Sequence, residues 1–161
     1  MKIRTVPVAA AIACAATALT AHDSKVGDLV IDHPMAFETA KTAQTGGGFM
    51  TITNNGTEDD TLISVNADFP RVEIHTTEMD GDIARMMKVE GITVPAGETV
   101  ALQPGGFHVM FMGLRGDPFE VGEEIPAILT FEHAGDLSIL FTVEKRNMDH
   151  GTMDHSGHGD S

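Results

Sequence analysis

Short apolar runs separated by tight-turn sequences constrain the fold of this 161-residue chain more than any other feature. The runs are rich in β-branched and aromatic residues, which favour strands. Nine strands are expected, over residues 29–32, 49–53, 61–65, 72–76, 83–89, 99–102, 107–112, 127–132 and 137–143. Turn sequences such as Asn54-Asn55-Gly56 and Pro104-Gly105-Gly106 separate them, and no long stretch has the periodicity of a capped helix. The pattern predicts an all-β fold, a Greek-key sandwich or barrel.

The beginning of the chain has the order of a secretory signal peptide. Lys2 and Arg4 precede an apolar run over residues 6–16, which is too short to span a bilayer, and small residues follow it. We expect cleavage after Ala21, with Ala18 as the alternative site. The expected domains are a signal peptide over residues 1–21, one folded domain over residues 22–146 and a tail over residues 147–161. The sequence therefore predicts an exported, periplasmic protein with a single core.

Cys14 is the only cysteine of the chain, and it lies inside the predicted leader. The exported protein would therefore have neither a disulfide nor a thiolate, which excludes a blue-copper electron-transfer centre. Cys14 could instead carry the lipid of a lipoprotein, but Ala11 stands where a larger aliphatic residue is expected in that signal. We therefore expect ordinary cleavage of the leader.

The formal net charge of -14 limits the kinds of molecule that the protein can bind. An acidic surface repels nucleic acid, so a nucleic-acid-binding function is excluded. The charge favours cations and basic partner surfaces, although it also serves solubility alone. The sequence contains no nucleophile elbow, no HExxH zinc motif and no glycine-rich phosphate loop before a helix. Enzymatic activity is therefore not expected.

His75, Met86, His108 and Met110 form a set of two imidazoles and two thioethers with the spacing H-x10-M-x21-H-x-M. Thioether sulfur is a soft ligand that binds zinc and calcium poorly, whereas two sulfurs with two imidazoles suit Cu(I). A single methionine is more often a flexible core side chain, and a single outward histidine is usually only solvated. The combination of four donors at this spacing predicts a Cu(I) site.

The expected strands place these donors on the outer face of the fold, because neighbouring side chains of a strand point to opposite faces. Apolar residues alternate with His108 and Met110, so both donors point outward, and the same alternation places His75 outward. The pattern around Met86 is less regular, and an outward position is the interpretation that we adopt. Met79 could supply a further thioether or be an exposed residue beside the next turn. A shallow, mostly exposed site is expected.

Residues 72–114 contain a series of short motifs: His75-Thr76-Thr77, Met79, Arg85-Met86, Val94-Pro95-Ala96-Gly97, Pro104-Gly105-Gly106-Phe107-His108-Val109-Met110 and Met112-Gly113-Leu114. With these motifs the segment closely resembles the PCu(A)C family of periplasmic copper chaperones. The likeness extends to Gly27-Asp28-Leu29, His33-Pro34, Gly48-Phe49-Met50-Thr51-Ile52 and Leu129-Thr130-Phe131-Glu132. The resemblance implies a cupredoxin-like β-barrel that binds Cu(I) through His75, Met86, His108 and Met110 and delivers it to cytochrome oxidase, especially the CuA centre. One departure is Met35, where relatives often have Trp.

The tail is a second candidate copper site. Its possible ligands are Met148, His150, Met153, His155 and His158. Its polar composition predicts disorder without metal. Three imidazoles suit Cu(II), while two thioethers could hold Cu(I); the alternative is a solvated acidic tail. If cleavage falls after Ala21, the amine and imidazole of His22 could also chelate Cu(II), with His33 nearby, or the new terminus could simply fray.

Three functions are compatible with these ligands. The leading hypothesis is a copper carrier that passes Cu(I) by ligand exchange to an acceptor of cytochrome oxidase assembly. A periplasmic copper buffer would use every one of the same ligands. A copper redox enzyme is less favoured, because two sulfurs bias the site toward Cu(I) whereas redox catalysis needs a metal that changes oxidation state. We expect a monomer that contacts the membrane only through its acceptor.

Overall fold

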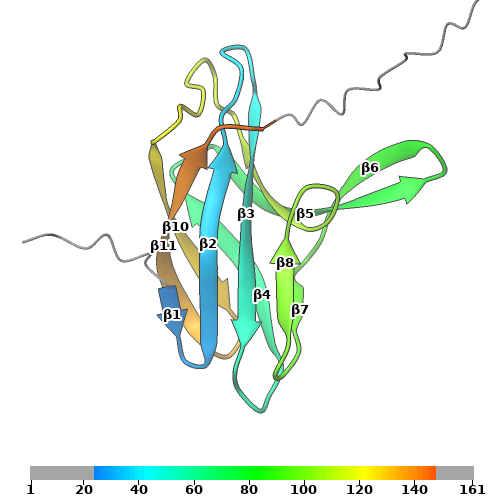
Figure 1. Cartoon of the computed structure of the whole chain (residues 1–161), viewed down its shortest axis with the longest axis vertical. Helices are drawn as coiled ribbons and strands as arrows, with labels where there is room; N and C mark the ends of the chain where they lie inside the picture. Colours follow the sequence, from blue (N-terminus) through cyan, green and yellow to red (C-terminus); the bar gives the residue numbers. More distant parts are fainter. Residues whose placement is uncertain (1–23, 148–161) are drawn as a thin grey trace, which may run out of the picture.

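The computed structural model describes residues 24–147 (Figure 1), and within them the chain is all-β, with eleven strands and no helix. The strands are β1 (Ser24–Val26), β2 (Leu29–Phe37), β3 (Thr45–Asn54), β4 (Asp60–Ala67), β5 (Arg71–Asp80), β6 (Ile83–Lys88), β7 (Ile92–Val94), β8 (Thr99–Leu102), β9 (His108–Met112), β10 (Glu124–Phe131) and β11 (Gly135–Glu144). No membrane-spanning helix occurs in this part of the chain. The predicted all-β fold is confirmed. The predicted leader and tail lie outside the described residues.

The strands form one curled sheet in the order β6-β5-β9-β3-β2-β11-β10-β4-β7. β1 pairs with β2, while β3 pairs with β9 along its first half and with β8 along its second half. All paired strands are antiparallel except β2 and β11, which run parallel. In Figure 1, β4 passes behind β3, and β4 also contacts β5. The sheet therefore curls around its own core.

All nine predicted strands are present, and β1 and β7 are short additions that the sequence pattern does not indicate. The first half of β3 is unexpected, because it consists largely of Gly46-Gly47-Gly48, and glycine is disfavoured in strands. A Cβ on Gly46 would overlap the ring of Phe119, and a Cβ on Gly48 would lie 2.8 Å from the ring of Phe111. Glycine is required here so that two aromatic rings can pack directly on the backbone.

The core behind β9 is built around Phe111. This side chain is fully buried, and its ring packs against those of Phe69, Phe119 and Phe141 at centroid distances of 5.2, 5.6 and 5.5 Å. Tilted and edge-on aromatic pairs of this kind add to the stabilisation from burial. Val109, the other inward residue of β9, is also 0% exposed. One face of β9 is therefore anchored in the core, which fixes the direction of the residues on its other face.

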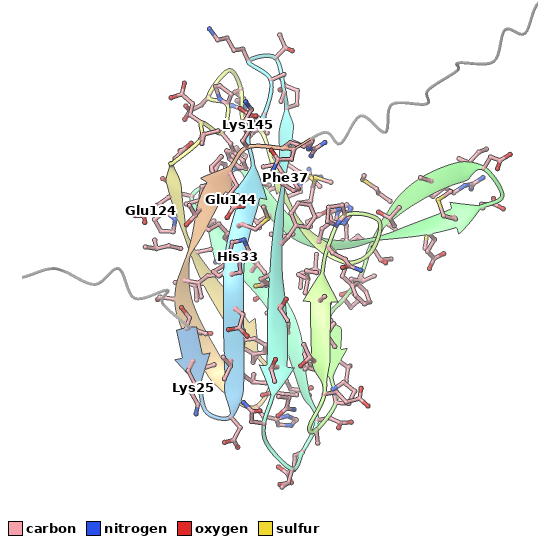
Figure 2. All side chains as sticks on the ribbon, in the orientation of Figure 1. Lys25, His33, Phe37, Glu124, Glu144 and Lys145 are labelled. Atoms are coloured by element: carbon pink, nitrogen blue, oxygen red, sulfur yellow. The ribbon has the colours of Figure 1, made fainter. Side chains whose placement is uncertain are left out.

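β5 and β6 form a hairpin that projects from the body of the domain (Figure 1). Every residue of β6 is exposed, and sulfur atoms lie along the hairpin (Figure 2). The large apolar side chains that the hairpin exposes are Met79, Ile83, Met86 and Met87, at 67%, 60%, 61% and 43%. Contiguous exposed apolar side chains often mark an interaction site. The hairpin therefore carries soft sulfur donors outside the packed part of the domain.

Asp60 ties the start of β4 to the turn between β10 and β11. Its carboxylate accepts hydrogen bonds from the backbone N–H groups of Thr61, His133 and Ala134 at 2.8, 3.0 and 2.9 Å. Burial by itself raises the pKa of Asp60, but these three hydrogen bonds, together with the charge of His133, lower it below its ordinary value. The ionised carboxylate therefore stabilises this corner of the fold.

Candidate metal centre

His75 and His108 face each other from neighbouring strands. They form a directly opposed pair of the antiparallel β5–β9 ladder, and their ring centroids are 5.9 Å apart. The adjacent pair, Ile74 and Val109, points into the core and is 4% and 0% exposed. The predicted alternation of these two strands is therefore confirmed. Both imidazoles lie on the face of the sheet opposite the core side chains.

Little of the imidazole pair is exposed, although both rings face away from the core. His108 is 4% exposed, and the side chain of His75 is 13% exposed. The ring centroids of Phe49 and His108 are 6.4 Å apart. The carbonyl of Gly106 accepts a hydrogen bond from the backbone N–H of Thr77 at 3.2 Å, which holds the turn before β9 alongside β5. The expectation of a mostly exposed site is wrong for the histidines, because alternation predicts a side chain's direction but not what covers it.

Each imidazole uses one nitrogen in a hydrogen bond and leaves the other without a partner. His75 Nε2 lies 2.9 Å from the carboxylate of Glu73, which can only accept, so Nε2 carries the proton. His108 Nδ1 donates in the same way to the carbonyl of Gly106 at 3.1 Å. The other two nitrogens, His75 Nδ1 and His108 Nε2, are buried with no hydrogen-bond partner among the described residues. Buried polar atoms are rarely left unpaired, so this pair indicates a bound ligand.

Met110 and Met86 flank His75 on the same face of the sheet. In the β5–β9 and β5–β6 ladders, each occupies the position diagonal to His75. Diagonal neighbours lie about 7–8 Å apart, within reach of a long side chain. Met110 is also two residues from His108, about 7 Å along the strand. His75 is therefore the central member of the predicted donor set.

Met86 stands apart from the other three donors. It is 61% exposed, and its strand is separated from that of His108 by β5. In a flat ladder, its Cα would lie roughly 16 Å from that of Met110. The structure thus brings His75, His108 and Met110 together on the body of the domain and carries Met86 on the projecting hairpin. One ion can contact both sulfurs only if the hairpin bends toward the histidines.

Glu73 connects the histidine pair to a surface cation. Its carboxylate accepts the hydrogen bond from His75 and lies 3.7 Å from the ammonium group of Lys88. The hydrogen bond from His75 outweighs the opposing effect of burial and, with the charges of Lys88 and Arg71, holds the pKa of Glu73 below its ordinary value. The ionised carboxylate orients His75 so that Nδ1 faces the site. Glu73 is absent from the predicted set, although its place two residues before His75 puts it on the same strand face.

The other candidate ligands lie outside this cluster. His33 Nε2 lies 3.0 Å from a carboxylate oxygen of Glu144, and Figure 2 shows both residues on the broad face of β2 and β11. Two strands, β3 and β9, separate β2 from β5. A surface groove lies on this broad face too, lined in part by Pro126, Ile128 and Leu140, and not beside the histidine pair. His22 and the tail ligands Met148, His150, Met153, His155 and His158 fall outside the described residues.

The donor set fits a monovalent copper ion better than a hard cation. Among residues 24–147, no group of three or more His, Cys, Asp or Glu side chains is arranged to hold a metal ion. The cluster instead combines two unpaired imidazole nitrogens with the thioether sulfur of nearby methionines. Thioethers select soft ions such as Cu(I). The protein is therefore a small all-β domain whose clustered imidazole and thioether donors suit copper.

The chain belongs to the LpqE-like family, described as "Putative lipoprotein LpqE-like", which matches residues 29–143. A curated relative, "Putative lipoprotein Lxx21020" of Leifsonia xyli subsp. xyli, is 32% identical over 74 residues. That match covers 45% of this chain and 44% of the relative, so the chain matches less than half of the relative's length.

Solved PCuAC domains share this fold. The apo PCuAC domain from PmoF1 has a TM-score of 0.66 and 25% identity, over 78% of this chain and 100% of that domain. The copper-bound PCuAC domain from PmoF2 has a TM-score of 0.66 and 28% identity, over 78% and 99% of the two chains. DR1885 from Deinococcus radiodurans, solved in its CuI form, has a TM-score of 0.58 and 28% identity, over 76% and 80%. The predicted resemblance to PCu(A)C proteins is confirmed for the domain fold.

Proposed function

We propose that this protein is a copper carrier that binds Cu(I) through His75, Met86, His108 and Met110 and passes it to an acceptor. The observation that carries the proposal is the pair of buried imidazole nitrogens on facing strands, neither of which has a hydrogen-bond partner among the described residues. The similarity to copper-bound PmoF2 and to the CuI form of DR1885 supports the choice of metal.

The unequal placement of the four donors suits an ion that must be released. His108 and Met110 belong to a strand anchored in the core, whereas Met86 is exposed on the hairpin. A thioether is a neutral ligand, so its replacement by a thiolate or imidazole of an acceptor does not require an anionic ligand to leave the copper cation. Because His75 Nδ1 and His108 Nε2 already have free lone pairs, binding and release require no proton transfer from the rings.

We propose a copper site of cytochrome oxidase assembly, such as the CuA centre, as the acceptor, because the resemblance to PCu(A)C chaperones implies that role. The proposed location is the periplasm, reached through the predicted signal peptide, and the descriptions of the family and of its Leifsonia relative as lipoproteins support export. Fractionation and mass spectrometry test the form of the exported protein. A soluble chain starting at His22 supports cleavage after Ala21, whereas a lipidated Cys14 in the membrane fraction contradicts it.

We also propose that the tail binds further copper, as Cu(II) on its imidazoles. The ligands would be Met148, His150, Met153, His155 and His158, with His22 as a separate Cu(II) ligand if it becomes the terminus. A full-length variant with the five tail donors replaced by alanine separates the two sites. This variant, called the tail variant below, should bind one Cu(I) and lose the part of the Cu(II) signal in electron paramagnetic resonance that comes from the tail, so that only a signal from His22 can remain. An unchanged Cu(II) signal contradicts the tail assignment.

The experiment that tests the proposed site is an anaerobic competition for Cu(I) between the tail variant and the chelator bathocuproine disulfonate. His75→Ala and His108→Ala should each lower the affinity by more than about 100-fold, because each removes a ligand and not merely an outer contact. His133→Ala is the matched control, since this histidine is exposed and lies in the turn between β10 and β11, beside Asp60. Unchanged affinity in both site variants would remove the basis of the proposal.

Delivery, buffering and catalysis predict different phenotypes. If the protein delivers copper, deleting it should lower cytochrome oxidase activity when copper is scarce. If it buffers copper, deletion should instead lower survival in excess copper with oxidase activity unchanged. Turnover of superoxide by the copper-loaded protein above the rate of free copper would favour an enzyme.

A further inference from the structure

We propose that Met79 and Met86 form a second, outer Cu(I) position on the β5–β6 hairpin, through which the ion enters and leaves the buried imidazole pair. The inference rests on the proposed copper-carrying function and adds a residue and a route to it. Met79 would act as a transfer ligand and not as a member of the resting site.

The strand register places the two methionines side by side. Met86 lies opposite Thr77, and Met79 lies opposite Ala84, so Met79 and Met86 are diagonal neighbours on one face of the hairpin. Such neighbours are about 7–8 Å apart, which long side chains can bridge. The residues directly across from them are small, and methionine is unbranched and flexible. The two sulfurs therefore have the room and the reach to meet at one ion.

Met86 is positioned to serve both copper positions. It is also the diagonal neighbour of His75, because His75 pairs with Lys88 two residues further along β6. Met79, by contrast, is four residues from His75, about 14 Å along the strand, and is too distant to share an ion with it in this conformation. The copper donors therefore form a series in which His75 of the imidazole pair is a diagonal neighbour of Met86, and Met86 is a diagonal neighbour of Met79.

Exposure increases along the same series. His108 is 4% exposed, Met86 is 61% exposed and Met79 is 67% exposed. Transfer outward then exchanges the ligands around one ion: the bonds from copper to His75 Nδ1, His108 Nε2 and the Met110 sulfur break, a bond to the Met79 sulfur forms, and Met86 remains bound throughout. Copper stays Cu(I), and the His75 ring keeps its proton on Nε2. An ion held by two exposed thioethers can then be taken by an acceptor.

The opposite face of the hairpin provides an internal control. Met87 lies opposite Thr76, so it points away from the face of Met86, and it is 43% exposed. Arg85 belongs to the same opposite face and ion-pairs with Asp80 at 3.1 Å. Met87 thus matches Met79 in residue type and hairpin location but cannot join the series of donors.

The test compares Met79→Leu with Met87→Leu in the tail variant. Competition with bathocuproine disulfonate gives the Cu(I) affinity, and stopped-flow mixing with an excess of the same chelator gives the release rate. Met79→Leu should keep the affinity within about twofold and slow release about fivefold, and Met87→Leu should leave both unchanged. Release at the unaltered rate in Met79→Leu would overturn the inference. A large loss of affinity would also overturn it, by making Met79 a ligand of the resting site.

Methionine methyl NMR with one equivalent of Cu(I) separates failure of the inference from failure of the proposed function. The expected result is large shifts for Met86 and Met110, a smaller exchange-averaged shift for Met79 and none for Met87. If Met86 and Met110 respond while Met79 behaves like Met87, only the outer position is wrong. If none of the four responds, the proposed copper site itself is wrong.

Discussion

Replacing Glu73 by alanine tests whether an outer carboxylate prepares His75 to bind copper. The carboxylate accepts the Nε2–H of His75 at 2.9 Å and is itself 18% exposed, so few other acceptors can take its place. Without it the ring can rotate and change tautomer, and only part of the population presents Nδ1 to the site. Removing such an orienting partner typically lowers metal affinity about 10–100-fold. We expect a loss in this range for Glu73→Ala and a smaller loss for Glu73→Gln, whose amide oxygen can still accept the hydrogen bond from Nε2–H but carries no charge.

The assay is the Cu(I) competition in the tail variant, with thermal unfolding of the apo protein as a check on folding. Glu78→Ala is the control, because Glu78 is exposed on the same strand but points to the opposite face, where it lies across from Arg85 in the β5–β6 register. The control should bind like the parent protein. If Glu73→Ala also binds within about twofold of the parent while remaining folded, the orienting role assigned to this carboxylate is refuted.

Two further predictions concern the fold that holds the site. Gly46→Ala should lower the free energy of unfolding by about 1–3 kcal/mol in urea titrations, because its Cβ would overlap the Phe119 ring; an unchanged midpoint contradicts this packing. The folded-state pKa of Asp60 is lowered, so its carboxylate stabilises the protein above about pH 4, and this contribution is lost as the pH falls further. Asp60→Asn should therefore lower the free energy of unfolding by about 1.5–3 kcal/mol at pH 7, and the difference in stability between variant and parent should become smaller below about pH 4. A difference that does not change with pH would contradict the stabilising role of the ionised Asp60 carboxylate.

The fold was largely predictable because most of its strands are runs of β-branched and aromatic residues bounded by turn sequences. The exceptions depend on packing between residues far apart in the sequence. β1 and β7, at three residues each, are too short to show a pattern. The glycine run at the start of β3 reads as a loop, and only the rings of Phe119 and Phe111 explain why it is a strand. Strand propensity depends strongly on such packing context.

The candidate site was predictable in its residues and their direction but not in its arrangement. Alternation along each strand indicates which way His75 and His108 point, yet their direct opposition depends on the register of β5 against β9. The hydrogen bond from His108 to the carbonyl of Gly106 has no signature in sequence, because every residue has a carbonyl. The separation of Met86 from the rest follows from the projection of the hairpin, which the strand pattern does not encode.

X-ray absorption at the copper edge, on the tail variant loaded with one equivalent of Cu(I), tests the central claim most directly. A site made by His75, His108, Met86 and Met110 predicts two imidazole nitrogens and two sulfurs around a monovalent ion. His108→Ala should remove one of the nitrogens and leave the sulfurs. A spectrum with no imidazole scattering, or one that His108→Ala does not change, would contradict the assignment of the paired histidines as the copper site.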